Sequence, residues 1–325
     1  MRYTELDLNG KNVLITGGAG FVGSNLALYI QDKYPKANIV VFDAFVLGHF
    51  KNLRGFKGEV ISGDITSHDD LARLEKFDKD HKFDYIFHQA AISDTTVMDQ
   101  KLVVAANTNA FKDILQIARK QGSMVIYASS AGVYGNSTAP NCVGEGEKPE
   151  NAYGFSKLMM DKIAMKYAPE YGIKVVGLRY FNVYGQREAY KGRTASMILQ
   201  MGLQILSGMQ PRLFKWGEQR RDFVYIDDVV QANIRALTAK KSAIYNVGSG
   251  EARAFNEIFG NLTKTLEKEI EVEYIDNPYP FFQSHTCADI RPIKDDLGYE
   301  PRFTVEKGIA SYAPKIMQIY EKELM

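Results

Sequence analysis

The sequence predicts an α/β protein built on a doubly wound parallel sheet, with a smaller and discontinuous second lobe. Short apolar runs rich in β-branched residues alternate with helix-length segments through the first half of the chain. This alternation is typical of βαβ units, whose parallel sheet is buried on both faces. Beyond Tyr184 the alternation ends, and glycine and proline interrupt the sequence, which indicates the second lobe.

The predicted strands are the short apolar runs, at Val13–Thr16, Ile39–Phe42, Val60–Ile61, Tyr85–Phe87, Met124–Tyr127 and Val175–Leu178. The predicted helices lie between them, at Phe21–Tyr34, Asp69–Lys79 and Lys101–Gln121. A later helix, Ile226–Thr238, and a strand, Ile244–Val247, are expected to return to the sheet. The boundaries that follow are 1–183 and 223–251 for the sheet domain, and 184–222 and 252–325 for the lobe.

Composition bounds the class of protein. The chain has 325 residues, 45% of them hydrophobic and 24% charged, and a formal charge of +1, so we expect a soluble protein that binds neither nucleic acid nor membrane. Cys142 and Cys287 lack the spacing of a redox or zinc motif. We also see no secretory leader and no apolar run of the ~18 residues that a membrane helix needs. Together these observations favour a cytoplasmic location. The histidines show no metal-ligand spacing, so no metal is predicted.

A glycine-rich segment, GGAGFVG at 17–23, directly follows the first predicted strand and begins a predicted helix. The spacing G-x-x-G-x-x-G in this context is typical of the Rossmann turn, which places pyrophosphate against a helix N-terminus. Asp43 ends the next strand, where an acid meets the adenosine ribose. The residues expected to bind the dinucleotide here are Gly17, Gly20, Phe21, Val22, Gly23 and Asp43.

Later strand ends complete the predicted cofactor site. Asp64 and Ile65 follow the third strand and are expected to flank the adenine, whereas an ordinary loop aspartate is an equally good interpretation. After the fourth strand, small residues let the backbone approach the cofactor, while His88 is expected to be a packed structural residue. The further predicted contacts are Gln89, Ala90, Ala91, Asn107 and Lys157.

The choice between NADP and NAD depends on the loop after the second strand. Asp43 favours a free ribose 2′-hydroxyl and therefore NAD, and so does Ala44 beside it. Lys51 and Arg54 follow closely, on a loop that could fold back to meet a 2′-phosphate. We expect NADP, with NAD as the alternative.

The sequence YGFSK places Tyr153 and Lys157 one helical turn apart on the same face. An ammonium beside a phenol stabilises the phenolate, so we expect a pKa for Tyr153 nearer the working pH and a role in proton transfer. Ser130 ends the fifth strand and is the expected hydrogen-bond partner of the reacting oxygen. Tyr-x-x-x-Lys alone is a chance pattern, but it follows a nucleotide-binding turn here.

These motifs together resemble the extended short-chain dehydrogenase/reductase family. The resemblance extends over nearly the whole chain, through RYFNVYG at 179–185, RDFVY at 221–225, NVG at 246–248 and DDLGY at 295–299, which look like the family's nucleotide-sugar enzymes. It implies a Rossmann domain, a nucleotide-sugar-binding lobe and a homo-oligomer. For the closest subfamily it implies a pentamer.

Within the family, SDTT at 93–96, REAYKG at 187–192 and TAS at 194–196 look like the ADP-glycero-manno-heptose 6-epimerases, enzymes of lipopolysaccharide core biosynthesis. The resemblance implies oxidation of C6 to a transient ketone, and it assigns Lys191 as a second base opposite Tyr153, with Lys157 and Ser130 completing the catalytic set. A phosphate-binding or solvated Lys191 is the alternative. The substrate contacts that it implies are Ser93, Ser130, Asn182, Lys191, Ser196, Phe214, Arg221 and Gln283.

Other functions are weighed against this one. A 4,6-dehydratase is disfavoured because Ser130 is followed by Ala131-Gly132 rather than by the Asp-Glu that elimination requires. A 4-epimerase or a reductase of the same family stays an alternative. A dinucleotide sensor without catalysis is disfavoured because both Tyr153 and Lys157 are present.

Overall fold

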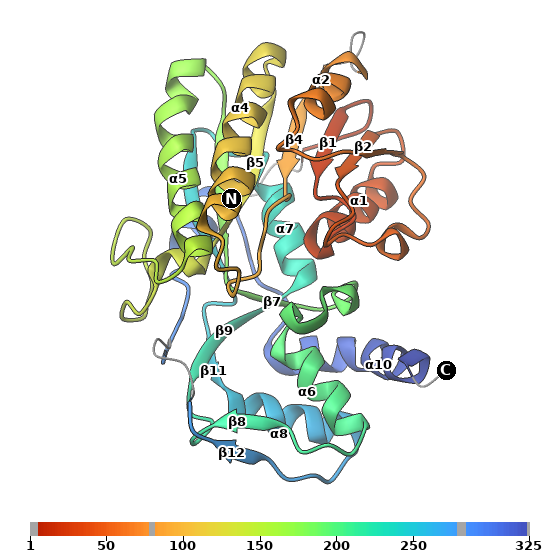
Figure 1. Cartoon of the computed structure of the whole chain (residues 1–325), viewed down its shortest axis with the longest axis vertical. Helices are drawn as coiled ribbons and strands as arrows, with labels where there is room; N and C mark the ends of the chain where they lie inside the picture. The colour runs from red at the N-terminus through yellow and green to blue at the C-terminus, as the bar shows by residue number, and fades with distance from the viewer. Residues whose placement is uncertain (1–5, 78–81, 278–283, 324–325) are drawn as a thin grey trace.

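A computed structural model describes residues 6–77, 82–277 and 284–323. Its larger part is a parallel sheet with helices on both faces, and the smaller part lies below it in Figure 1, so the predicted fold class is confirmed. Among the described residues the sheet has seven strands in the order β10-β6-β5-β4-β1-β2-β3. The strands are β1 Asn12–Thr16, β2 Asn38–Asp43, β3 Glu59–Ser62, β4 Tyr85–His88, β5 Met124–Ser130, β6 Val175–Tyr180 and β10 Ala243–Val247.

Each predicted strand lies in this sheet, including the returning strand, because β10 pairs in parallel with β6. The strand order reverses between β1 and β4, so a crevice opens there at the carboxyl ends of the strands. Alternate residues of β1 enter different cores: Val13 and Ile15 pack on one face and Leu14 on the other. Continuous apolar runs, rather than alternating ones, therefore mark these strands.

The helices form two layers. Leu26 of α1 (Phe21–Lys33) and Val229 of α7 (Ile226–Ala236) belong to the core on one face. On the other face, α2 (His68–Phe77), α4 (Ala110–Gln121) and α5 (Ala152–Tyr171) cover the sheet, as Figure 1 shows. Lys79, at the predicted end of α2, lies outside the described residues.

The single helix predicted over Lys101–Gln121 is interrupted. It consists of α3 (Gln100–Val103), a π-helical turn η2 (Val104–Asn109) and α4. The buried side chain of Asn107 lies in the π turn and bonds the backbone N–H and C=O of Ile92 and the hydroxyl of Ser156. These bonds tie the loop after β4 to α5, which explains why the helix widens here.

The helix α5 carries the Tyr-x-x-x-Lys motif. Asn151 caps its N-terminus by accepting a hydrogen bond from the backbone of Gly154, and the chain leaves the helix through Gly172 in the left-handed conformation. Tyr153 therefore lies in the first turn and Lys157 in the next turn of a well-capped helix.

The second part contains two small sheets and a helical layer. Its strands are β7 (Asn182–Tyr184), β9 (Arg220–Tyr225) and β11 (Ala252–Ala254) in one sheet, and β8 (Arg212–Phe214) and β12 (Glu273–Ile275) in the other. Its helices are α6 (Met197–Leu206), α8 (Phe255–Leu266) and α10 (Val305–Glu323), while α9 (Arg291–Leu297) packs near β10. Strand β9 crosses the predicted domain boundary at residue 223. No helix among the described residues is long and apolar enough to span a membrane.

A buried ion pair joins α5 to the sheet. Arg179 of β6 is almost fully buried and binds Asp161 of α5 at 2.8 Å and Glu147 at 2.7 Å. The hydroxyl of Tyr127 in β5 donates to the same Asp161 carboxylate, and Arg179 also donates to the hydroxyl of Tyr134. Removing one member would leave the others buried without their partner.

We predict that Arg179→Met lowers the free energy of unfolding by about 3–5 kcal/mol, because the Asp161 carboxylate would stay buried without its counter-ion. Arg212→Met is the control, since Arg212 and Glu273 form an exposed pair expected to contribute about 0–1 kcal/mol. Urea unfolding of both variants, followed by fluorescence, measures the difference. Equal losses in the two variants would contradict the assigned role of the buried pair.

Candidate active site

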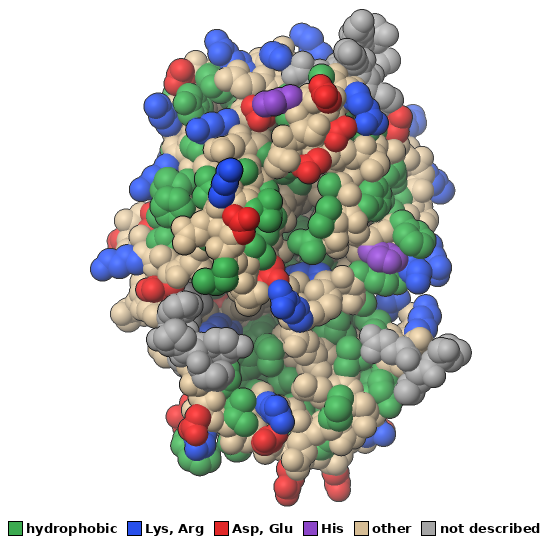
Figure 2. Space-filling view, viewed as in Figure 1, with side chains coloured by type: hydrophobic (Ala, Val, Ile, Leu, Met, Phe, Trp, Pro, Cys, Tyr) green, Lys and Arg blue, Asp and Glu red, His purple; other side chains and the backbone are tan. Residues whose placement is uncertain are grey.

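A cavity of about 500 Å³ lies at the carboxyl ends of the central strands. In Figure 2 the face of the molecule is hollowed between the sheet domain and the lower part. Most of the predicted site residues line this cavity: Gly17, Gly20, Phe21, Val22, Gly23, Asp43, Asp64, Ile65, Gln89, Ala90, Ala91, Ser93, Ser130, Tyr153, Lys157 and Lys191.

At Gly17 and Gly23, a Cβ would meet backbone atoms of neighbouring segments. Gly17 has φ +67°, and a Cβ there would lie 2.6 Å from the backbone nitrogen of Ala90. A Cβ on Gly23 would collide with the carbonyl oxygen of Gly17. The turn, the loop after β4 and the first turn of α1 therefore approach one another closely, which leaves backbone N–H groups at the helix N-terminus facing the cavity.

Asp43 is buried and supports the same turn. One carboxylate oxygen accepts the N–H of Ala19 at 2.8 Å, and the other accepts the N–H of Phe45 at 2.8 Å. Burial raises the pKa of Asp43, and these backbone hydrogen bonds oppose that shift. The carboxylate thus fixes the glycine turn and the loop beyond β2, and it also lines the cavity.

Ser130, Tyr153 and Lys157 meet beside the end of β5. The ammonium of Lys157 donates to the carbonyl of Ala128 at 2.7 Å and lies 5.9 Å from the centre of the Tyr153 ring. The hydroxyl of Ser130 accepts the N–H of Gly132 and also lies near the Tyr153 phenol, where its hydrogen bond lowers the phenol's pKa. The three side chains therefore share one wall of the cavity, as their positions in the sequence predict.

The pKa of Tyr153 differs from the expectation. Burial raises it above the ordinary value, with Ser130 acting in the opposite direction, whereas the sequence pattern predicts a lowered pKa from Lys157. The reason is that Lys157 is itself buried, which lowers its pKa to about 8, and its ammonium is directed at a backbone carbonyl. In the free protein, Tyr153 consequently holds its proton.

Lys191 reaches the cavity from the 3-10 turn η4 (Ala189–Thr194). Its ammonium lies 5.5 Å from the centre of the Phe21 ring at the start of α1. Burial lowers the pKa of Lys191, and the negative charge of Glu188 acts in the opposite direction. A lysine with a lowered pKa in a cavity is suited to accept a proton.

An exposed ion pair connects the loops on the two sides of the cavity. Arg193, two residues after Lys191, binds Asp94 at 3.0 Å and donates to the hydroxyl of Thr96. Asp94 follows Ser93 on the loop after β4, so the bridge joins the sheet domain to η4. The side chain of Arg193 is 79% exposed, and a pair of this kind contributes little to stability.

Several predicted residues lie away from the cavity wall. The amide of Asn182 donates to the carbonyl of Asp222, and the hydroxyl of Ser196 donates to Glu188 and caps α6. Arg221 is partly buried against the Phe255 ring, and burial lowers its pKa to about 10. Asn107 and Phe214 are also absent from the lining, and Gln283 lies outside the described residues. All of these contacts stay predictions.

Some lining residues were not singled out by the sequence reasoning. Leu102 and Ala106 reach the wall from the interrupted helix, and Val46 and Leu47 reach it from the exposed loop after β2. Tyr180 also lines the cavity, and its hydroxyl donates to Gln89 or Asn233 within one hydrogen-bond network. Tyr180 belongs to the RYFNVYG motif, which was the available signal, whereas nothing in the sequence marks Leu102 or Val46.

The site contains no constellation for a metal ion, as far as the described residues extend: no group of three His, Cys, Asp or Glu is arranged to hold one. His88 is fully buried, bonds the hydroxyl of Thr16 at 2.8 Å and packs on Phe111. Burial, and secondarily the charge of Lys157, lower the pKa of His88 to about 3, so the imidazole is neutral.

Known proteins share this architecture over almost the whole chain. The chain is 53% identical to the ADP-L-glycero-D-manno-heptose-6-epimerase of Helicobacter pylori, with 98% of this chain and 99% of that chain covered and a TM-score of 0.90. A UDP-N-acetylglucosamine 4-epimerase from Methanobrevibacter ruminantium is 28% identical, with 97% and 99% covered and a TM-score of 0.87. The UDP-glucose 4-epimerase of Thermotoga maritima is 27% identical, with 97% and 100% covered and a TM-score of 0.87.

Residues 13–248 match the NAD dependent epimerase/dehydratase family. This match includes the glycine turn and the Tyr-x-x-x-Lys pair, which meet in one cavity at the strand ends. The chain therefore belongs to the NAD-dependent epimerase/dehydratase family of extended short-chain dehydrogenases/reductases.

Proposed function

We propose that this protein inverts C6 of ADP-D-glycero-D-manno-heptose to give ADP-L-glycero-D-manno-heptose, a step in building the lipopolysaccharide core. One observation carries the proposal: Tyr153 and Lys191 reach the same cavity from different parts of the fold. Inversion of a carbinol without net redox needs two proton-transfer groups, one for each face of the carbon. The 53% identity to the H. pylori 6-epimerase supports the choice of sugar and carbon.

The residues present fit a nicotinamide dinucleotide. The glycine turn lets backbone approach a pyrophosphate without a Cβ in the way, and Asp43 and Lys157, which line the same cavity, would each meet one of the two riboses. A dinucleotide held by these residues would supply a nicotinamide ring able to accept hydride from the sugar carbon and to return it. Residues 184–222 and 252–325 form the proposed nucleotide-sugar lobe.

The two groups divide the two proton transfers between them. Lys191, whose pKa is lowered by burial, takes the proton of the C6 hydroxyl as the carbon loses hydride. The ketone then turns so that its oxygen faces Tyr153, which holds its proton and donates it as hydride returns to the opposite face. A proton then passes back from Lys191 to Tyr153 through solvent, so the cycle consumes nothing. The reverse reaction uses the two groups in the opposite order.

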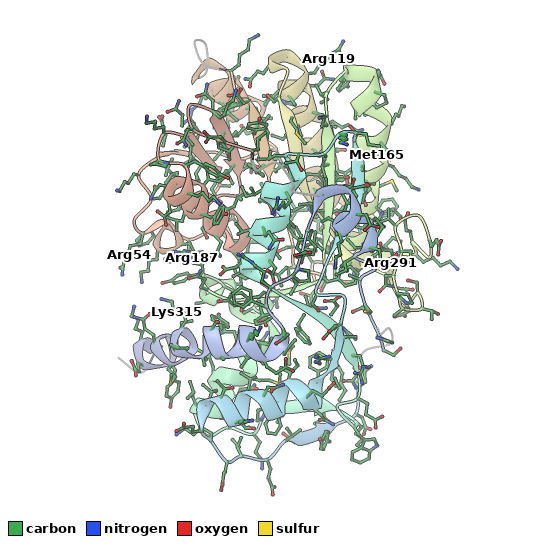
Figure 3. The ribbon with its side chains drawn as sticks, turned by 180° about the vertical axis from the view of Figure 1, so that it is seen from behind. Arg54, Arg119, Met165, Arg187, Arg291 and Lys315 are labelled. Carbon is green, nitrogen blue, oxygen red and sulfur yellow. The ribbon has the colours of Figure 1, made fainter. Side chains whose placement is uncertain are left out.

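The cavity favours NAD over the NADP that the sequence reasoning preferred. The cations among the described lining residues are Lys157 and Lys191, and neither belongs to the loop beside Asp43. Lys51 lies over the ring of Tyr190, and Arg54 lies near Arg187 and Lys315 at the left edge of the view in Figure 3. A ribose 2′-phosphate beside Asp43 would meet a carboxylate and apolar Val46 and Leu47 rather than a cation.

The homo-oligomeric state, the pentamer implied by the resemblance and the cytoplasmic location stay predictions. A single chain carries the glycine turn, Tyr153 and Lys191, so the proposed chemistry is complete within one subunit.

We predict that Tyr153→Phe lowers kcat for inversion of the ADP-heptose by about 10²–10⁴, because it removes a proton-transfer group while keeping the ring. Bound dinucleotide should be retained. Tyr167→Phe, on the same helix but away from the cavity, is the control and should turn over like the wild type. Conversion is followed by NMR of the C6 configuration, and undiminished turnover in Tyr153→Phe would remove this residue from the mechanism.

We predict that Lys191→Met lowers kcat for inversion by about 10² or more with little change in KM, as expected for lost proton transfer. Steady-state kinetics with the ADP-heptose measure both constants. Lys51→Met is the matched control, since Lys51 is a neighbouring cation outside the cavity. A raised KM with kcat kept would instead identify Lys191 as a binding residue and favour another nucleotide-sugar epimerase of the family.

We predict that the dinucleotide bound by the purified protein is NAD. Denaturation of the protein followed by chromatography of the released nucleotide identifies it directly. As a matched test, Leu47→Arg places a cation on the loop beside Asp43 and should raise the affinity for NADP relative to NAD. Recovery of NADP alone from the wild type would refute this choice.

A further inference from the structure

Glu188, the first residue of the E-x-x-K segment, is a charged side chain buried away from the cavity. It is 0% exposed and does not line the cavity. One carboxylate oxygen accepts the N–H of Gly185 at 3.0 Å and the hydroxyl of Ser196 at 2.8 Å, and the other accepts the N–H of Ser196 at 2.6 Å. A buried carboxylate with this many donors is a structural anchor.

The anchor holds both ends of the turn that carries Lys191. Gly185 precedes the turn and Ser196 follows it, and both donate to the same carboxylate. Within the turn, the N–H of Lys191 donates to the carbonyl of Glu188 at 2.9 Å, and the hydroxyl of Thr194 donates to the carbonyl of Lys191. Glu188 thus holds the two ends of the turn through its carboxylate and bonds the N–H of Lys191 through its own backbone carbonyl.

Glu188 is also the negative charge that acts on Lys191. Burial lowers the pKa of Lys191, and Glu188 opposes that shift. The other groups that face Glu188 are the phenols of Tyr312 on α10 and Tyr184 on β7, which burial keeps protonated and neutral. The remaining titratable groups among the described residues of the cavity wall belong to other elements: Asp43, Asp64, Tyr153, Lys157 and Tyr180.

We propose that Glu188 is the positioning residue for Lys191: its buried carboxylate fixes the turn that carries this lysine and holds a negative charge near the amine. This inference rests on the proposed function only in naming Lys191 as a base, because the effect on the amine exists in the free protein. Glu188, outside the cavity, and Lys191, inside it, therefore act as one unit.

The experiment measures the titration of Lys191 directly. Protein with ¹³C-labelled lysine side chains is titrated by NMR, and the Lys191 resonance is assigned by its loss in Lys191→Met. In Glu188→Gln, the midpoint of Lys191 should fall by about one pH unit, because an attractive charge has been removed. The inversion kcat of this variant should fall by about 10- to 100-fold, since the turn loses part of its anchor.

The control is Asp228→Asn. Asp228 is equally buried and likewise accepts backbone N–H groups, those of Arg302 and Phe303, but it is not among the charges that act on Lys191. Its substitution should leave the Lys191 midpoint unchanged. An unchanged midpoint in Glu188→Gln, or an equal shift in Asp228→Asn, would overturn the proposal.

Glu188→Asp separates the charge from the anchor. It keeps the negative charge and shortens the side chain, so the midpoint should stay near the wild-type value while kcat falls. Should Glu188→Gln fail to fold, this variant still tests the anchor, and a wild-type kcat would refute it. A wild-type protein that does not act on the ADP-heptose refutes the proposed function, whereas the titration still decides the role of Glu188.

Discussion

The buried ion pair between Asp161 and Arg179 fixes the helix that carries Tyr153 and Lys157 against the sheet. It joins α5 to β6 inside the protein, and Tyr127 extends it to β5. Asp161 lies one turn beyond Lys157 on the same helix face, so the ion pair that anchors the helix also places negative charge beneath the buried ammonium. Without the ion pair, the buried ammonium of Lys157 would keep its hydrogen bond to the carbonyl of Ala128 but would lose the negative charge of Asp161 that stabilises it.

Buried carboxylates recur as anchors in the second part of the fold. Asp222 accepts the N–H groups of Ser249, Gly250 and Ala288, and thereby holds two segments distant in sequence against β9. The carboxylate of Asp228 accepts the N–H groups of Arg302 and Phe303 and so fixes the segment that leads into α10. Loops with little regular structure are thus fixed by single acids that satisfy several backbone donors at once. A substrate that enters such a lobe meets surfaces that are already ordered.

Local sequence patterns predicted the sheet and the cofactor side of the cavity, because their constraints are local. Gly17 and Gly23 are required by contacts within one turn, and Tyr153 and Lys157 share a face through helical spacing alone. The interruption of the helix at Asn107 was missed because its cause is a set of bonds to distant segments. The pKa of Tyr153 was missed for the same reason, since burial depends on the assembled fold and not on spacing.

The order of the strands in the sheet has a consequence for how the protein is made. Strand β6 has β5 on one side and β10 on the other, yet β7, α6, β8, β9 and α7 are all synthesised between β6 and β10. Until Ala243–Val247 emerge from the ribosome, the edge of an apolar strand stays open to other chains. The last contact of the sheet is also among its most distant in sequence, so its closure is expected to be slow. A nascent chain stalled within the smaller part would therefore present an aggregation-prone edge on β6, the neighbour of the strand that ends at Ser130.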